Sequence, residues 1–173
     1  PYGSRGWHPF ANGPQPHTWL TWDTRGTGTT GVGLYNDQTE AHEMLYQFAE
    51  IDIGEVYRDY TYRVYAVRTD LHFPAVHYLS KSHPLARISA GLKTKFPDET
   101  VTITSETRDN SKAIVLVQGD RNPGQFLLVD LTAKRVEPLF SRKPELARES
   151  LSPMLPIELN VRDGTKIYGY ITS

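Results

Sequence analysis

The sequence predicts an all-β, mainly antiparallel protein that carries one short helix. Short runs of β-branched and aromatic residues recur along its 173 residues, and turns rich in Asp, Asn, Pro and Gly separate them. Ten tyrosines, three tryptophans and six phenylalanines, together with twelve prolines and thirteen glycines, suit a chain with many strands and many turns. Residues 85–95 alone place their apolar side chains at helical spacing.

Residues 101–140 show the strand pattern most clearly. Turn clusters separate the four expected strands, at residues 101–104, 113–117, 125–129 and 135–140. The two middle runs are apolar on both faces, as in a strand covered on both sides, so Leu116 and Leu128 are expected to be buried. Four consecutive strands joined by tight turns in about 40 residues are typical of one blade of a β-propeller.

An earlier segment repeats this pattern. Arg58-Asp59 recurs as Arg108-Asp109, and at the same offset residues 64–67 correspond to residues 114–117. Residues 34–37 in turn resemble residues 127–130. Repeats of this size bury their faces by stacking on neighbours. The sequence therefore predicts a partial β-propeller of about three blades with one short inserted helix.

The chain divides into four segments. Residues 1–17 are rich in Gly, Pro and Ser, and we expect an irregular segment there. Residues 18–142 hold the blades, whose earlier strands are expected at residues 18–22, 32–35, 42–46, 53–57, 64–67 and 76–79. Residues 143–156 are expected to form a linker, and residues 157–173 a hairpin that turns at Asp163-Gly164.

The helix at residues 85–95 interrupts the repeat, and we expect it as an insertion on the last strand of one blade. It should end before Pro97, because the residue before a proline disfavours helical backbone. Its stripe of Leu85, Ile88 and Leu92 is interpreted as a packing face, ahead of the alternative that it binds a partner.

Composition excludes several classes of protein. The chain has no cysteine, which excludes disulfides and cysteine-bound metals, and its net charge of -1 gives no electrostatic footprint for nucleic acid. No apolar run approaches the roughly 20 residues of a membrane span. We expect a soluble protein of undetermined compartment, with the cytoplasm favoured over the periplasm or secretion. Because the chain starts at Pro1 without an initiator Met, we expect its N-terminus to be either a cut inside a longer protein or a processed end.

Three stretches carry a resemblance to a known family: SETRDNSKAIVLVQGDRNPGQFLLVDL, LFSRKPEL and MLPIELNVRDGTKIYGYITS. They resemble the prolyl oligopeptidase family of serine peptidases, on its dipeptidyl aminopeptidase and acylaminoacyl-peptidase side. In that family a β-propeller precedes an α/β-hydrolase domain, which opens with a hairpin that has an Asp-Gly turn and a strand of the type GYL. Asp163-Gly164 and Gly169-Tyr170-Ile171 match that hairpin, and the resemblance covers residues 52–173 well and residues 18–48 less closely.

The resemblance implies the last part of a propeller and the first strands of a truncated hydrolase domain, with the family's catalytic residues beyond Ser173. The nucleophile of the family lies in a GxSxG elbow, which this chain lacks, since Gly3-Ser4-Arg5-Gly6 is not one. We therefore assign no catalytic and no substrate-binding residue.

The expected function is that of a non-catalytic propeller fragment, inactive alone, which shields the active site of a peptidase and filters peptide substrates by size. Its expected partners are the missing hydrolase domain and further copies of the chain, through open blade faces and the edges of the terminal hairpin. The alternative is a stand-alone β-repeat module that binds a peptide or a glycan.

One glycine motif is a candidate cofactor site. Gly26, Gly28 and Gly31 form the GxGxxG pattern of a dinucleotide-binding loop. That loop requires a helix at its last glycine, whereas a strand-like run follows here. We expect the tip of a hairpin and predict no cofactor.

The candidate metal ligands are the six histidines, which are His8, His17, His42, His72, His77 and His83. A site built from His72, His77 and His83 is disfavoured, because an odd spacing places side chains on opposite faces of a strand. No metal site is predicted.

Several charged residues receive structural interpretations. Asp37, Glu40 and Glu43 lie near a turn and are expected to be solvated. Asp109 and Asp120 begin turns, where a short carboxylate accepts backbone N–H groups. Arg58 and Arg121 are expected to form salt bridges between blades, in preference to binding a substrate carboxylate.

Overall fold

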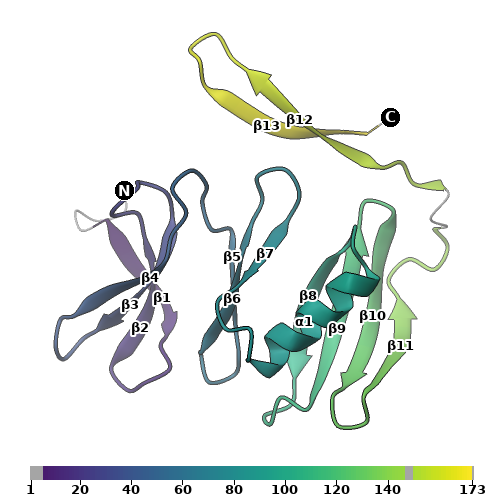
Figure 1. Cartoon of the computed structure of the whole chain (residues 1–173), viewed down its shortest axis with the longest axis horizontal. Coiled ribbons are helices and arrows are strands. Elements are labelled where there is room, and N and C mark those ends of the chain that lie inside the picture. Colours follow the sequence, from purple (N-terminus) through teal and green to yellow (C-terminus); the bar gives the residue numbers. More distant parts are fainter. Residues whose placement is uncertain (1–5, 147–149, 173) are drawn as a thin grey trace. The chain divides into compact units, whose positions relative to one another are not determined.

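The computed structural model describes residues 6–146 and 150–172, which form antiparallel strands and one helix (Figure 1). The strands are β1 (Trp7–Asn12), β2 (Thr18–Asp23), β3 (Gly31–Asn36), β4 (His42–Tyr46), β5 (Glu55–Arg58), β6 (Val64–Thr69), β7 (Ala75–Tyr78), β8 (Thr100–Glu106), β9 (Lys112–Gly119), β10 (Asn122–Asp130), β11 (Arg135–Ser141), β12 (Met154–Asn160) and β13 (Lys166–Thr172). The helix α1 spans Pro84–Lys95. The predicted all-β, antiparallel class is confirmed.

The strands form successive meanders in chain order. β1 to β4 make a four-stranded sheet, β5 to β7 a three-stranded sheet, β8 to β11 a second four-stranded sheet, and β12 and β13 a two-stranded hairpin. The described strands do not close into a barrel. Three blade-like sheets agree with the predicted number of about three blades. The chain divides into two compact units, residues 1–80 and residues 81–173.

In the first unit, the β1–β4 and β5–β7 sheets share a hydrophobic core. Val32, Ile53 and Val67 are its buried centre, and side chains from both sheets pack around them. The connection between the sheets is fixed by a 2.9 Å hydrogen bond from the Ile53 N–H to the Thr30 carbonyl oxygen. The two sheets therefore bury apolar side chains against one another and stabilise each other.

The prediction of an irregular segment at residues 1–17 is wrong for residues 7–12. These residues form β1, which pairs with β2 from Trp7↔Asp23 to Asn12↔Trp19. Phe10 stacks on Trp22 with ring centroids 4.6 Å apart, so the strand contributes to the core. Proline content obscured this strand in the sequence. Pro9 is tolerated because β1 is an edge strand and its register shifts between Pro9 and Ala11.

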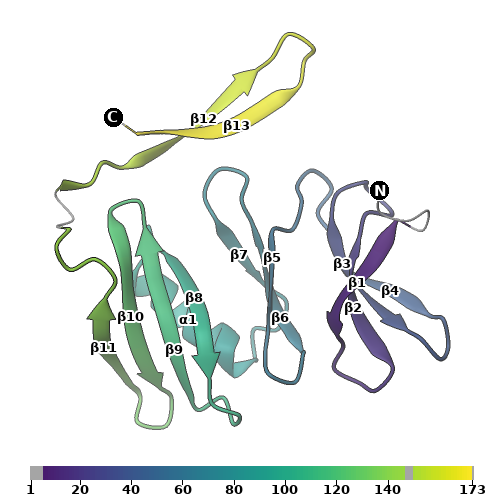
Figure 2. The same ribbon diagram turned by 180° about the vertical axis from the view of Figure 1, so that it is seen from behind.

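In the second unit, α1 lies across one face of the β8–β11 sheet, as the views from front and back both show (Figures 1 and 2). Its stripe of Leu85, Ile88 and Leu92 is buried, so the interpretation as a packing face is confirmed. The helix begins after His83, whose Nδ1 accepts a 3.3 Å hydrogen bond from the Leu85 N–H. It ends at Lys95, as predicted, two residues before Pro97. In the chain α1 follows β7, the last strand of the three-stranded sheet.

The expected burial of Leu116 and Leu128 is wrong, because only one face of the β8–β11 sheet is closely covered. The buried side chains of β9 and β10 are Ala113, Val115, Val117, Leu127 and Val129. Leu116 and Leu128 alternate with them and are half-buried.

Leu127 and Leu128 therefore offer a matched pair of variants. Leu127→Ala is expected to lower the free energy of unfolding by about 2–5 kcal/mol, because Leu127 is buried. Leu128→Ala should cost less, since its side chain is already partly exposed before the change. Urea titration of both variants measures the difference, and equal losses would contradict this assignment of the buried face.

The terminal hairpin forms as predicted. β12 and β13 pair from Met154↔Thr172 to Asn160↔Lys166, and Asp163 accepts a 2.9 Å hydrogen bond from the Thr165 N–H in the turn. β12 begins at Met154, so the linker expected at residues 143–156 ends earlier than predicted, because these residues pair with β13. Most apolar side chains of the hairpin are exposed, among them Leu155, Leu159, Ile167 and Ile171. Among the described residues, no helix is long and apolar enough to cross a membrane.

Candidate functional site

The glycine motif forms the loop between β2 and β3 and not a phosphate cradle. Gly31 is the first residue of β3, and Gly26 and Gly28 adopt φ angles of 89° and 85° in the turn. The backbone groups that follow are engaged within the protein. The Thr29 carbonyl oxygen accepts a hydrogen bond from Gln47 Nε2, and the Thr30 N–H donates one to Asp52 Oδ1, both at 2.6 Å. The predicted hairpin tip is confirmed.

Four polar side chains of the first sheet form a cluster that spans β2 and β4. They are those of Thr21, Asp23, Arg25 and His42. Asp23 is fully buried, and its Oδ2 accepts a 2.7 Å hydrogen bond from Arg25 Nη2. Arg25 Nη2 also contacts His42 Nδ1, while His42 Nε2 lies 2.9 Å from Thr21 Oγ1 and 3.4 Å from Asp23 Oδ2. Thr21 and His42 reach each other across Gly33 of β3, which has no side chain to block the contact.

This cluster contains a hydroxyl, an imidazole and a carboxylate, but its geometry is not that of a catalytic triad. In a triad the carboxylate orients one imidazole nitrogen, and the other accepts the proton of the nucleophile. Here Thr21 and Asp23 both face Nε2 of His42, and Arg25 faces Nδ1. Because Arg25 is only a donor, Nδ1 must be the acceptor and the proton of the neutral ring is on Nε2. His42 therefore has no nitrogen left to deprotonate Thr21, and the cluster stabilises the sheet.

The same cluster predicts a dependence of stability on pH. Burial and the neighbouring Arg25 charge lower the pKa of His42 from its ordinary value of 6.5, although Asp23 opposes the shift. The unfolded chain therefore takes up this proton before the folded chain does, so stability is complete above pH 6.5 and falls as the pH drops below it. Urea titrations from about pH 7.5 to about pH 5 should show this loss. The loss should be smaller in His42→Gln, and an identical pH profile in both proteins would contradict the prediction.

The three histidines of the disfavoured metal site lie in separate parts of the fold. His77 Nε2 lies 3.0 Å from Thr69 Oγ1, and its ring packs on Phe48 with centroids 4.6 Å apart. Burial lowers the pKa of His77. His83 caps α1, and His72 lies in the turn before β7. In the described parts of the chain, no group of three or more His, Cys, Asp or Glu residues is placed to hold a metal ion.

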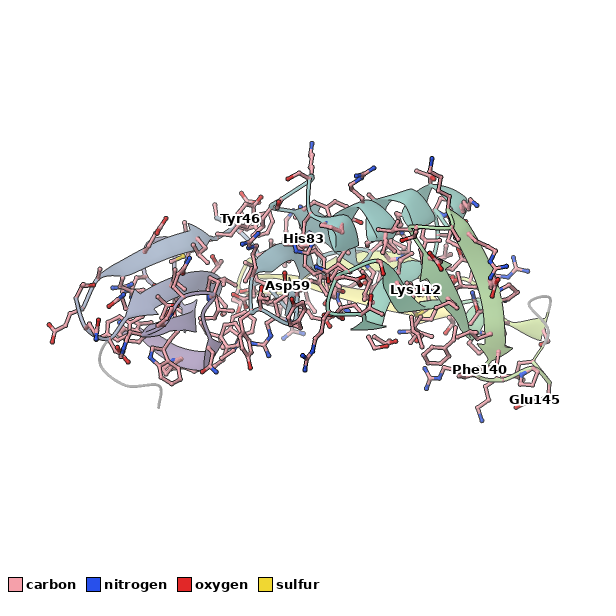
Figure 3. All side chains as sticks on the ribbon, turned by 90° about the horizontal axis from the view of Figure 1, so that it is seen from below. Tyr46, Asp59, His83, Lys112, Phe140 and Glu145 are labelled. Carbon is pink, nitrogen blue, oxygen red and sulfur yellow. The ribbon has the colours of Figure 1, made fainter. Side chains whose placement is uncertain are left out.

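The repeated Arg-Asp pair marks the same turn in two sheets. Asp109 Oδ1 accepts hydrogen bonds from the Thr107 hydroxyl and the Ser111 N–H, and the Thr107 bond is the main reason that the pKa of Asp109 falls to about 2. Asp59, labelled in Figure 3, accepts equivalent bonds from the Thr61 N–H and hydroxyl. Asp120 likewise accepts the Arg121 N–H. The expected turn-capping role of Asp109 and Asp120 is confirmed.

Among the described residues, Arg58 has no acidic partner within salt-bridge distance, in contrast to the expected salt bridge between blades. Its guanidinium lies over the ring of Tyr62, 5.5 Å from the centroid, within the turn that joins β5 and β6. A cation–π contact inside one sheet replaces the predicted contact because Tyr62 lies only four positions along the chain, in the same tight turn.

A pocket of about 430 Å³ opens at one end of the first unit, and we call it the turn pocket. It is lined by Asn12, Gly13, Pro14, Gln15, Pro16, His17, Thr18, Trp19, Asp37, Thr61 and Tyr62. These residues come from the β1–β2 loop and adjoining strand ends, the β3–β4 turn and the β5–β6 turn. A second cavity of about 340 Å³, lined by Gly6, His8, Trp22, Thr24, Thr30 and Ile53, lies near the β2–β3 loop.

Asp37 is exposed, as expected, and its carboxylate is in addition hydrogen-bonded at the wall of the turn pocket. Its Oδ2 accepts a 3.0 Å hydrogen bond from Trp19 Nε1, and its Oδ1 lies 3.1 Å from His17 Nδ1. The Trp19 bond is the main reason that the pKa of Asp37 is lowered. The sequence did not predict these hydrogen bonds of Asp37. Only the register that pairs Thr18 with Asn36 brings Asp37 beside Trp19. Glu40 and Glu43 are exposed, as expected.

Comparison with known proteins gives a fold but no family. No family model and no curated protein matches the sequence. Among solved structures, the chain is similar to a puromycin-hydrolyzing peptidase of Mycobacterium tuberculosis, with a TM-score of 0.61 and 14% sequence identity. The match covers 95% of this chain and 25% of that one, so the chain spans about a quarter of the length of that peptidase.

Proposed function

We propose that this chain is a non-catalytic propeller portion of a serine peptidase of the prolyl oligopeptidase family. In the whole protein it would shield the active site and filter peptide substrates by size. The observation that carries the proposal is the similarity of almost the whole chain to one quarter of a peptidase.

Two features of the chain support a non-catalytic role. The sequence has no GxSxG elbow, and the hydroxyl nearest to a histidine in the polar cluster, that of Thr21, faces a nitrogen that already holds a proton. The exposed apolar side chains of the β12–β13 hairpin also fit the proposal, because further strands of a hydrolase domain would cover them.

The coding sequence that follows Ser173 tests the proposal directly. We expect it to encode a GxSxG motif, followed in chain order by the Asp and His of a triad. A stop codon directly after Ser173 would contradict the proposal and favour the alternative, a stand-alone β-repeat module that binds a peptide or a glycan.

The isolated chain is expected to associate with itself, because most apolar side chains of the hairpin are exposed. Sedimentation at micromolar concentration should show a dimer or a larger species. A version of the protein that is extended through the proposed hydrolase domain should form oligomers of fewer chains. It should also bind less of a hydrophobic dye. A strictly monomeric chain that binds no dye would contradict this expectation.

A further inference from the structure

The turn pocket has the volume of a ligand site and is open to solvent. Its volume of about 430 Å³ is within the roughly 300–1,000 Å³ of small-molecule sites. It combines aromatic rings, prolines, amides and one carboxylate, and no lysine or arginine is among the described residues that line it. Its charge at neutral pH is therefore set by Asp37.

The carboxylate of Asp37 is held in place, ionised and accessible. Trp19 and His17 each fix one of its oxygens, and the Trp19 bond lowers its pKa. Its side chain is 39% exposed. Because a carboxylate offers about four acceptor positions, each oxygen of Asp37 has room for a further donor from a ligand.

Two aromatic rings stand at the same pocket. Trp19 is 38% exposed and Tyr62 is 39% exposed, so both rings are accessible from solvent. The π faces of Trp and Tyr attract cations. The guanidinium of Arg58 already lies over the ring of Tyr62, and because Arg58 is not among the residues that line the pocket, a ligand cation would have to contact the part of the ring that Arg58 leaves open.

The backbone holds two of these side chains in a costly conformation. His17 and Tyr62 have φ angles of 61° and 64°, a left-handed region that disfavours residues other than glycine and is rare for a bulky aromatic. Glycine or asparagine would fill the turn position of Tyr62 at a lower cost. Strained residues of this kind concentrate at ligand sites, where the side chain is what the position requires.

We infer that the turn pocket binds an organic cation, the guanidinium or ammonium group of a basic side chain, with Asp37 as its charge partner and Trp19 and Tyr62 as its aromatic walls. An anionic ligand is disfavoured by the Asp37 charge, and a metal ion by the single carboxylate of the wall. The inference is independent of the proposed function, because it concerns residues of the first unit and requires no catalysis.

Titration of the 173-residue chain with small neutral-backbone probes tests it. The probes are N-acetyl-arginine N-methylamide, the equivalent lysine compound, and the citrulline compound as an uncharged isostere of arginine. The indole N–H resonance of Trp19, assigned through Trp19→Phe, reports binding beside Asp37. We expect saturable shifts with the arginine or the lysine probe, which distinguishes guanidinium from ammonium. The citrulline probe should bind at least about tenfold more weakly. Equal binding of citrulline, or no shift with any probe, would overturn the inference.

Matched variants separate the effects of the Asp37 charge and the Tyr62 ring on binding from effects on folding. Asp37→Asn should weaken binding of the cation by at least about tenfold, whereas Glu43→Gln, which removes a charge from the same β3–β4 hairpin but outside the pocket, should leave it unchanged. Tyr62→Asn removes the ring but places a residue there that tolerates the left-handed backbone, and it should weaken binding of the cation. Tyr62→Phe keeps an aromatic ring and should leave binding of the cation unchanged. If Asp37→Asn does not fold, the Tyr62 pair decides, and equal affinities of its two variants would overturn the inference.

Discussion

The isolated chain is expected to hydrolyse neither peptide nor ester substrates, and a serine-directed fluorophosphonate should label none of its serines. The reason is chemical. An acyl-transfer hydrolase of the serine type needs an activated nucleophile, and the chain has no GxSxG elbow to present one. Loss of a nucleophile or its base lowers kcat by about 10⁶-fold in serine peptidases. Activity of the chain alone should therefore be indistinguishable from the uncatalysed rate.

The matched measurement uses the chain extended by the coding sequence that follows Ser173. If the proposed hydrolase domain is encoded there, the extended protein should be labelled by the fluorophosphonate and should hydrolyse peptide substrates. Replacement of its GxSxG serine by alanine should abolish both properties. Turnover by the isolated chain that the fluorophosphonate abolishes, with a labelled serine among residues 1–173, would contradict the prediction.

Local chemistry made most strands predictable from the sequence. β4 was expected at residues 42–46 and spans His42–Tyr46, because alternation and flanking turn residues are signals within a few positions. The Asp163-Gly164 turn and the end of α1 before Pro97 were equally local. β1 was missed because Pro9 and the glycines around it carry a loop signal, which pairing with β2 overrides.

Long-range pairing decided the features that the sequence did not reveal. The Trp19–Asp37 bond depends on the register of β2 against β3, and the polar cluster on a contact between β2 and β4 across Gly33. The half-burial of Leu116 and Leu128 depends on which sheet face is covered, and an apolar run carries no signal for that. The turn pocket is formed by three turns that are distant in the sequence, so no local sequence motif predicts it.

Gly33→Ala is expected to lower the free energy of unfolding by about 2–4 kcal/mol. A methyl group at this position would lie 2.7 Å from both His42 Nε2 and Thr21 Oγ1 and 3.0 Å from the carbonyl oxygen of Glu43. The first two contacts separate the Thr21–His42 hydrogen bond, and the third requires a shift of the β4 backbone. Overpacking costs about 1–3 kcal/mol and a broken buried polar contact costs a similar amount.

Gly91→Ala makes the same chemical change where no atom lies within 4 Å of the added methyl group. Because Gly91 lies inside α1, alanine should stabilise the chain there by about 0.5–1 kcal/mol. Opposite signs of the two changes, measured by urea titration at pH 7.5 or above where His42 is neutral, are the expected result. A Gly33→Ala chain as stable as the original would mean that Thr21 and His42 do not bond across β3. The polar cluster would then contribute nothing to the packing of the first sheet.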